Sequence, residues 1–203
     1  MVRNLVFDFG KVLVDYDFVT TLDGFVEEDN DRAGFKRLLL DQAFVDETDI
    51  GIMSLQDIML REQRRHPQWA EAFRRFDENF LEFIKGEIPG MHVLLSRLRD
   101  EGFRLYGLTN WSNTVYRVIG KYDILRMMDG TVISSEEKIV KPDVRIYLRL
   151  CEKFGLNIDE CIFTDDKQVN VDGARRAGMK AILFRDAQQY EHDLREMLRV
   201  WGD

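Results

Sequence analysis

The sequence is poor in cysteine, in proline and in long apolar runs. Of its 203 residues, three are proline and two are cysteine, Cys151 and Cys161. Two cysteines at this spacing make neither a disulfide framework nor a metal motif, so we expect buried, reduced thiols. No apolar stretch approaches the roughly 20 residues that a transmembrane helix needs, and the N-terminus has no secretory pattern. These absences predict a cytoplasmic protein without a membrane partner.

Basic charge is also scarce. The chain has 29 Lys and Arg residues against 37 Asp and Glu residues, which gives a net charge of −8. A protein that binds nucleic acid regardless of sequence needs a basic surface to neutralise phosphates, so we expect no nucleic-acid partner. A local cationic pocket for a small anion remains compatible with this balance. With 45% apolar and 33% charged residues, the composition is that of an ordinary globular protein.

Short apolar segments alternate with helical patterns along most of the chain. The predicted strands are 4–8, 103–110, 130–134, 161–166 and 180–185. The predicted helices are 90–102, 112–122, 145–155, 170–178 and 190–201, and Gly102, Gly155 and Gly178 are expected to end three of them as left-handed caps. Such alternation is typical of a parallel sheet with crossover helices. We therefore predict an α/β fold with a three-layer, Rossmann-like core.

One long segment interrupts this alternation. Residues 16–88 contain amphipathic patterns at 35–47, 54–65 and 69–84, and this stretch is far longer than an ordinary connection between strands. We predict a helical cap subdomain at 16–88, inserted into a core domain formed by 1–15 and 89–203. Open parallel sheets bind ligands at the C-terminal edge of their strands, so the insertion is expected to lie over that edge as a lid.

Polar residues stand where the predicted strands end, or at the start of the helix that follows. The first strand ends in Asp8, two residues before Gly10, although Asp is a poor strand residue and costly to bury without partners. The other such residues are Thr109, Asn110, Lys141, Asp165 and Asp166. Each has an ordinary explanation alone, such as a turn, a helix cap or a surface lysine. Together they place carboxylates, a hydroxyl and an ammonium at one edge of the predicted sheet, and these are the groups that phosphoryl transfer with a divalent ion uses.

Four sequence motifs agree with this interpretation. "FDFGKVLVD", "LTNWS", "KIVKPDVRIY" and "FTDDKQVNVDGARRAG" occur in an order and spacing that together resemble the haloacid dehalogenase-like hydrolase superfamily, in subfamily IA with its helical cap after the first strand. The resemblance covers nearly the whole chain, although the cap matches only in position and helical character. The most similar members are sugar-1-phosphate phosphatases and the N-terminal phosphatase domain of soluble epoxide hydrolases.

The resemblance implies a role for each motif residue. Asp8 is expected to attack phosphorus and form an aspartyl-phosphate. Mg²⁺ is expected to bind the carboxylates of Asp8 and Asp166 and the main-chain carbonyl of Gly10, while Asp165 orients a metal-bound water. The remaining residues are expected to contact a small phosphorylated substrate: Thr109 and Asn110 hold phosphoryl oxygens, Lys141 offsets negative charge, and Trp111 lines the pocket or covers the sheet edge.

Gly10 departs from the family pattern. Related phosphatases usually carry Asp here to protonate the leaving alcohol, and glycine keeps the carbonyl but supplies no proton. The chain therefore either favours easier leaving groups, with sugar 1-phosphates as candidates, borrows an acid from the cap or substrate, or turns over little. Gly10→Asp is expected to raise turnover most on poor leaving groups.

Three functions remain open at this point. A Mg²⁺-dependent phosphatase acting on small phosphorylated metabolites agrees best with the acidic pair, Asp165 and Asp166. A 2-haloacid dehalogenase would use Asp8 against carbon without a metal, and this acidic pair would repel its anionic substrate. A phosphate-binding regulatory protein of low turnover would have no need of Asp8, Lys141 and Asp166 together. The oligomeric state and the physiological substrate are not encoded in any motif.

Overall fold

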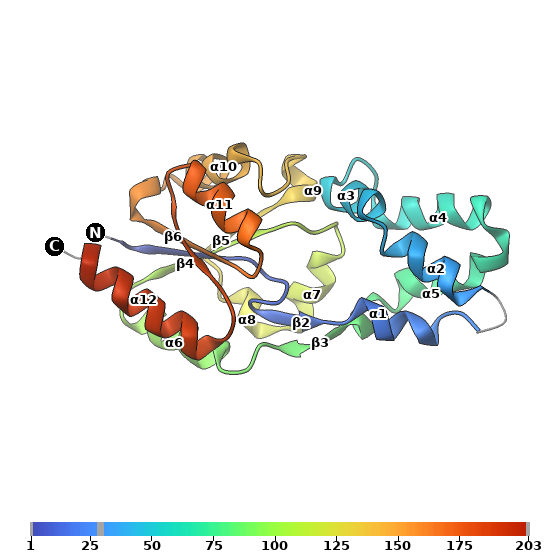
Figure 1. Ribbon diagram of the computed structural model, residues 1–203, viewed down its shortest axis with the longest axis horizontal. Helices are drawn as coiled ribbons and strands as arrows, with labels where there is room; N and C mark the ends of the chain where they lie inside the picture. The colour runs from blue at the N-terminus through green and yellow to red at the C-terminus, as the bar shows by residue number, and fades with distance from the viewer. Residues whose placement is uncertain (1, 28–30, 202–203) are drawn as a thin grey trace.

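A parallel β-sheet forms the centre of the molecule (Figure 1). The structure, a computed structural model, describes residues 2–27 and 31–201. The sheet has the strand order β5-β4-β1-β6-β7, and every neighbouring pair is parallel. Its strands are β1 (Asn4–Phe7), β4 (Arg104–Thr109), β5 (Gly130–Ile133), β6 (Cys161–Asp165) and β7 (Lys180–Leu183). All five lie where the sequence predicted strands, and the predicted α/β class is confirmed.

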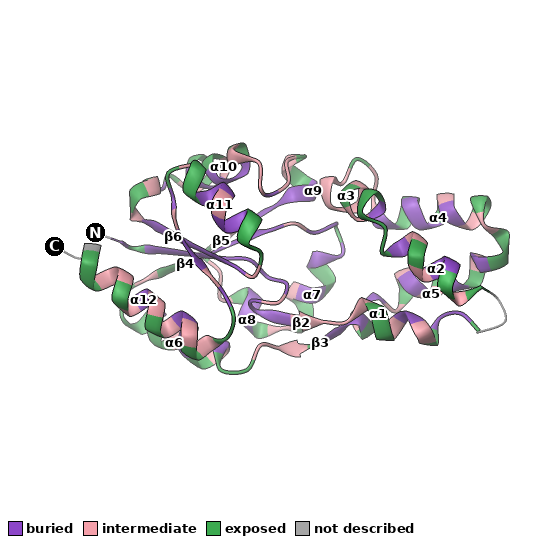
Figure 2. Cartoon of the chain, in the orientation of Figure 1, coloured by how far each residue is buried: buried purple, intermediate pink, exposed green. Residues whose placement is uncertain are grey.

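Helices cover both faces of this sheet. One face packs against α6 (Met91–Asp100), α7 (Val115–Lys121), α8 (Asp123–Arg126) and α12 (Ala187–Trp201), and the other against α10 (Val144–Phe154) and α11 (Gln168–Arg176). Side chains of β1 alternate between the two clusters, because successive strand residues point to opposite faces. β1 and β6 are therefore buried throughout, and β4 is buried except at Arg104 (Figure 2). Both cysteines are buried and free, as predicted.

A helical segment, α1–α5, separates β1 from the rest of the sheet. Its elements are α1 (Phe18–Thr21), α2 (Arg32–Leu39), α3 (Gln42–Ile50), α4 (Leu55–Arg65) and α5 (Ala70–Glu78), with 3₁₀ turns at Leu22–Gly24, Pro67–Trp69 and Phe80–Phe83. The chain enters it through β2 (Val14–Tyr16) and leaves through β3 (Ile84–Glu87). These two strands pair antiparallel, so the two connections lie side by side (Figure 1).

Two predictions within this segment were wrong in detail. The helix predicted over 35–47 is two helices, because the chain turns at Leu40 and the Asp41 side chain accepts a hydrogen bond from the backbone N–H of Ala43 and caps α3. The pattern at 69–84 does not continue as one helix either. It passes through α5 and a 3₁₀ turn before β3, a strand that the sequence did not predict.

The helical segment touches the core at the short helix α9 (Ser134–Glu137). Ser134 Oγ donates to the carbonyl of Asp49 at 2.5 Å, and Lys138 Nζ donates to the carbonyl of Gly51. Gly51 ends α3 with φ +66°, and a Cβ there would lie 2.7 Å from the Cα of Ser135. Only glycine combines that backbone angle with so close an approach.

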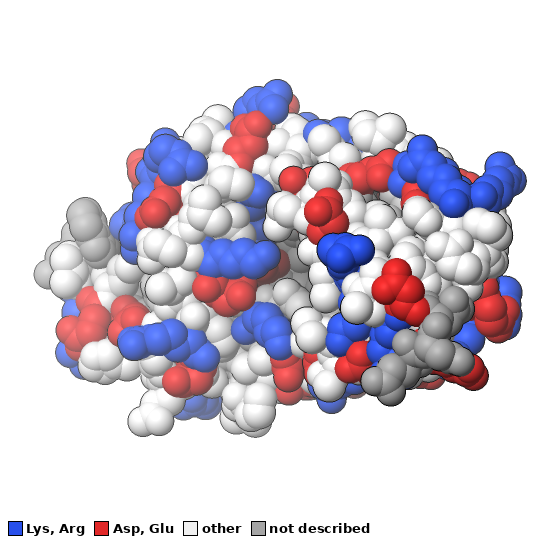
Figure 3. All heavy atoms as spheres, turned by 45° about the vertical axis from the view of Figure 1, so that its right-hand side comes forward, with Lys and Arg blue, Asp and Glu red and all other residues white. Residues whose placement is uncertain are grey.

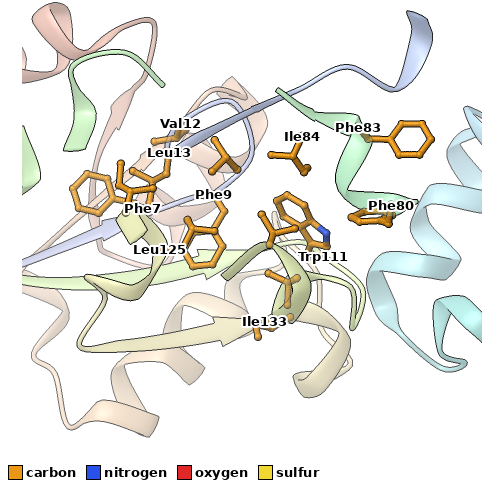
Figure 4. Packing of buried hydrophobic residues seen from close by; sticks show 14 of the residues in the cluster. Phe7, Phe9, Val12, Leu13, Phe80, Phe83, Ile84, Trp111, Leu125 and Ile133 are labelled. Carbon is orange, nitrogen blue, oxygen red and sulfur yellow. The ribbon is translucent and has the colours of Figure 1, made fainter. Parts of the chain in front are cut away.

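Apolar packing also joins the two regions. Figure 4 shows the Trp111 ring between Ile133 of the core and Phe80 and Ile84, which stand at the exit of the helical segment. All four residues are buried and belong to one continuous cluster. Among the described residues, no helix has the length and apolarity to cross a membrane.

Candidate active site

The residues singled out in the sequence converge at the C-terminal edge of the sheet. Asp8 follows β1, Asp165 ends β6, and Lys141 precedes α10. Lys141 Nζ lies 3.0 Å from Asp8 Oδ1 and 2.7 Å from Asp165 Oδ2. Parallel strands bring distant positions to one edge in this way. The two carboxylates and the ammonium therefore form a single buried cluster.

Asp165 has its hydrogen-bonding capacity filled by protein groups. Its Oδ1 accepts from the backbone N–H of Lys167 at 2.8 Å, and Asn170 Nδ2 lies 3.0 Å from both carboxylate oxygens. With Lys141 on Oδ2, each oxygen has two donors. Asp165 thus holds Lys141 in place, and Asn170, from α11, secures Asp165.

Asp8, Asp165 and Asp166 each offer an oxygen within 4.8 Å of the other two. Burial and the nearby Asp165 raise the pKa of Asp166. Burial also raises the pKa of Asp8 to about 6, against the opposing attraction of Lys141. Clustered carboxylates held in this way suit a hard divalent cation, which neutralises their mutual repulsion. The donor set therefore fits the predicted Mg²⁺.

Lys141 keeps its charge despite complete burial. Burial by itself would lower the pKa of Lys141, but Asp165 and Asp8 together raise it above its usual value. The side chain also passes over the ring of Phe163, with Nζ 5.3 Å from the ring centre. A fixed ammonium thus lies beside the Asp8 carboxylate.

Thr109 and Asn110 follow the same edge but differ in what they offer. Thr109 Oγ1 is buried with no hydrogen-bond partner among the described residues, and Thr109 is one of the residues that line the site cavity. Buried hydroxyls are usually paired, so this atom is suited to a bound ligand. The Asn110 side chain instead bridges to the backbone of Lys141, accepting from its N–H at 2.8 Å and donating to its carbonyl at 3.1 Å. Asn110 thus positions the lysine.

A cavity of about 690 Å³ opens over these residues. The sheet edge forms its floor, and side chains of α1, α2, α3 and α5 form the facing wall. Trp111 lies in its lining, but its indole N–H donates to Thr114 Oγ1 at 3.1 Å, so only the ring is available to a ligand. On the face of the molecule shown in Figure 3, acidic and basic side chains are mixed, and neither positive nor negative charge forms a broad patch.

Tyr16 lines the cavity, although no sequence motif pointed to it. A Cβ built on Gly10 would lie 2.7 Å from Cε1 of its ring. Tyr16 belongs to β2, and its pairing with β3 brings the ring over Gly10. The glycine is therefore matched to a specific neighbour, and an aspartate at this position would have to displace the ring.

Asp49, on α3, also lines the cavity and was missed. Burial raises its pKa to about 7, with Asp8 and Asp46 adding to the rise and Lys167 and Lys141 opposing it. The sequence signal was weak, because Asp49 is one of several acidic residues on an amphipathic helix. Only the docking of α3 against α9 turns it toward the sheet edge.

Comparison with known proteins places the chain among hydrolases. Residues 2–178 match the family described as haloacid dehalogenase-like hydrolase. Over 97% of the chain and 94% of the relative, the sequence is 29% identical to Phosphatase MT3486 of Mycobacterium tuberculosis (strain CDC 1551 / Oshkosh). It is 28% identical over 59% of its length to glyceraldehyde 3-phosphate phosphatase of Pyrococcus abyssi, where the match spans about half, 51%, of that relative.

The fold is shared with a solved structure as well. A haloacid dehalogenase-family enzyme of Bacteroides thetaiotaomicron, solved in complex with magnesium and inorganic phosphate, superimposes with a TM-score of 0.77 at 20% identity. The similarity covers 92% of this chain and 96% of that one. At this identity the likeness establishes the fold, including the helical segment, and leaves the chemistry to be argued from the site.

Proposed function

Because the chain belongs to the haloacid dehalogenase-like hydrolase family, we propose that it is a Mg²⁺-dependent phosphatase acting on small phosphorylated metabolites through an aspartyl-phosphate. The observation that carries this proposal is the Asp8–Lys141–Asp165 cluster beside Asp166. Carboxylate-dependent dehalogenation needs no metal, whereas three carboxylates this close together need a cation to coexist with an anionic substrate. Relatives named as phosphatases support the same reaction class.

In the first step, Asp8 Oδ attacks phosphorus, and the bond from phosphorus to the substrate oxygen breaks with its electron pair leaving on that oxygen. Water then attacks the phosphorus of the aspartyl-phosphate, which releases inorganic phosphate and regenerates Asp8. Lys141, 3.0 Å from Asp8, offsets the charge that would otherwise repel the phosphate. Thr109 Oγ1, which has no hydrogen-bond partner within residues 2–27 and 31–201, donates to a phosphoryl oxygen.

Asp8, Asp166 and the carbonyl of Gly10 would hold the metal, with Asp165 in an orienting role because its oxygens are already occupied. Bound there, Mg²⁺ supplies a positive charge that stabilises the developing charge on the phosphoryl oxygens. The magnesium and phosphate bound by the relative of the same fold support this assignment.

Residues 16–88, which contain the helical segment, act in this proposal as a cap. They enclose the cavity from the side opposite the sheet and exclude water during attack. The paired strands β2 and β3 carry both connections to the core and are suited to transmit its movement. Asn110 positions Lys141 and does not contact the substrate with its side chain, and Trp111 contacts the substrate only with its ring.

The test is a release assay with para-nitrophenyl phosphate and a panel of phosphorylated metabolites that includes sugar 1-phosphates. Mg²⁺ should support phosphate release, a chelator should reduce it at least about 10²-fold, and Asp8→Asn should be inert while remaining folded. Halide release from 2-haloacids that survives the chelator would instead establish a dehalogenase. Binding of phosphate without turnover on any ester would establish the low-turnover alternative.

A further inference from the structure

The wall that faces the sheet edge is predominantly apolar. It includes Val19 of α1, Leu40 at the end of α2, Phe44 of α3 and Phe76 of α5. Val19 is 57% exposed and Leu40 is 41% exposed, although both line the cavity. Large apolar side chains left open inside a cavity gain free energy when a ligand covers them.

The polar side chains on this wall are mostly bonded to their own neighbours. Asp17 accepts from the N–H of Thr20 at 2.9 Å and caps α1. Lys85 donates to Thr21 Oγ1 at 2.7 Å and to a backbone carbonyl, and Thr48 donates to the carbonyl of Val45. A ligand that needed these groups would have to break existing bonds.

This wall is poorly matched to a sugar. Each ring hydroxyl buried without a partner costs free energy, and a site that recognises sugars provides convergent donors and acceptors for them. We infer that the preferred substrate is a phosphate monoester of an apolar alcohol, with the phosphate on the sheet edge and the hydrocarbon body against Val19, Leu40, Phe44 and Phe76. This inference rests on the proposed phosphatase function and replaces sugar 1-phosphates as the favoured class.

A homologous series tests the inference without changing the leaving group. Ethyl, butyl, hexyl and octyl phosphate release alcohols of nearly equal acidity, so differences in kcat/KM report on binding of the body. We expect kcat/KM to rise about fourfold per methylene, the equivalent of about 0.8 kcal/mol, until the wall is covered. Octyl phosphate should also exceed glucose 1-phosphate.

A matched pair of variants locates the effect. Leu40 and Leu60 both lie in the helical segment and are 41% and 44% exposed, but only Leu40 lines the cavity. Leu40→Asn should lower kcat/KM for octyl phosphate roughly tenfold more than kcat/KM for ethyl phosphate, whereas Leu60→Asn should change neither. Calorimetric binding of octylphosphonate and ethylphosphonate gives the same comparison without turnover.

The outcomes separate this inference from the function on which it rests. Equal rates across the alkyl series, or a preference for sugar phosphates, would overturn the apolar subsite while the phosphatase stands. Loss of octylphosphonate binding in both leucine variants would also overturn it, because the effect would not belong to the cavity. No hydrolysis of any ester, para-nitrophenyl phosphate included, would overturn both.

A second observation concerns the acid that Gly10 cannot provide. Asp49 is the exception on the apolar wall, since its carboxylate has no hydrogen bond or ion pair with another residue in 2–27 or 31–201. The carbonyl of the same residue is held by Ser134 Oγ at 2.5 Å, which fixes the helix end against the core. The charged groups that influence its carboxylate are Lys167, Lys141, Asp8 and Asp46.

We propose that Asp49 is the proton donor for the leaving alcohol, supplied by the helical segment in place of the missing group at residue 10. As the phosphorus–oxygen bond breaks, the Asp49 carboxyl proton passes to the departing oxygen. The resulting carboxylate then takes a proton from the water that attacks the aspartyl-phosphate, which restores the acid. Burial raises the pKa of the carboxyl to about 7, so a large share of the molecules hold this proton near neutral pH.

The dependence on leaving group tests this role. Asp49→Asn should lower kcat/KM at least about 10²-fold on alkyl phosphates but less than about threefold on para-nitrophenyl phosphate, whose leaving group needs no acid. Asp46→Asn, on the exposed side of the same helix, is the control: it removes only the weakest of the charges that act on Asp49 and should change either rate less than about threefold. An equal loss on both esters, or no loss on either, would overturn the proposal, and unchanged octylphosphonate affinity would confirm that the site is intact.

Discussion

The core side of the cavity and its helical side differ in how their charged groups are held. At the sheet edge, Lys141 bonds two carboxylates and Asn170 secures one of them, so each charge is fixed by another. On the helical side, the polar groups are hydrogen-bonded to one another, and the Asp49 carboxylate, which lines the cavity, has no hydrogen-bond partner in the part of the chain that the structure describes.

This difference separates two tasks. A preorganised cluster of charges suits the chemical step, because its geometry does not have to reorganise as charge develops. An open apolar wall suits recognition of the substrate body, because the free energy of apolar contact is roughly proportional to the buried area and does not depend on direction. In the proposed function, the fixed charges of the sheet edge carry out the chemical step, and the apolar wall selects the substrate.

The largest effect should come from replacing the cluster lysine. Lys141→Met would leave two buried carboxylates facing each other, with an expected loss of about 3–5 kcal/mol in the free energy of unfolding and at least about 10³-fold in kcat. Lys85→Met replaces the lysine on the helical side, which is exposed and holds only local groups. The kcat of Lys85→Met should stay within about threefold of the parent. Denaturant unfolding gives the free energy of unfolding of both variants, and steady-state kinetics give their kcat values. Similar losses of stability and kcat in the two variants would contradict the difference between the sheet edge and the helical side.

The pH dependence of stability should isolate Asp49. Its pKa rises from 3.8 to about 7 on folding, so the folded state keeps a proton that the unfolded state loses. The free energy of unfolding should therefore fall as pH rises from about 4 to about 7, by at most about 4 kcal/mol, and level off above that.

The measurement is urea unfolding from pH 4 to 8, with Asp49→Asn and Asp46→Asn compared against the parent. Asp49→Asn should lower the slope, and Asp46→Asn should leave it nearly unchanged, because Asp46 is exposed and is the weakest of the charges that act on Asp49. The slope that remains is expected from Asp8, whose pKa is also raised by burial. Parallel slopes in all three proteins would place the titrating group elsewhere.

Alanine substitutions at two glycines with nearly the same φ should distinguish the contribution of α3–α9 packing to stability from that of backbone strain. Gly51 has φ +66° and meets Ser135, whereas Gly155 has φ +62° and no atom within 4 Å of an added Cβ. Gly155→Ala should cost about 1 kcal/mol from strain alone. Gly51→Ala should cost about 1–3 kcal/mol more and raise KM, because it pushes α3 away from α9. Equal costs, by thermal unfolding, would mean that the docking of α3 against α9 adds nothing to stability.

The smallest effect concerns Gly10 and Tyr16. Gly10→Asp alone should give no gain on alkyl phosphates, because the Tyr16 ring stands 2.7 Å from the new Cβ. In the Asp49→Asn protein, adding Gly10→Asp together with Tyr16→Ala should raise kcat/KM on alkyl phosphates roughly tenfold. Tyr16→Ala alone is the control. A gain from Gly10→Asp alone would show that the ring yields easily.

Local pattern was enough to predict the sheet. Each strand is a short apolar run bounded by a glycine or a polar residue, and β1 ends at Phe7, one residue before the predicted end at Asp8. Gly102, Gly155 and Gly178 all have the predicted positive φ. The break at Asp41 and the strands β2 and β3 were not predictable in the same way, because Asp41 lies inside an apolar periodicity and the two strands are short and pair across the whole helical segment.

The amino-acid sequence was sufficient to identify the reactive groups and their order along the chain, because a parallel strand–helix alternation carries every strand end to the same side of the sheet. The surroundings of these groups depend on the tertiary structure. The Tyr16 ring lies over Gly10, the Asn110 side chain is hydrogen-bonded to the backbone of Lys141, and Asp49 lines the cavity. Each of these placements depends on how segments distant in the chain pack together. Packing partners of that kind are set by contacts far apart in the chain, which no local pattern records.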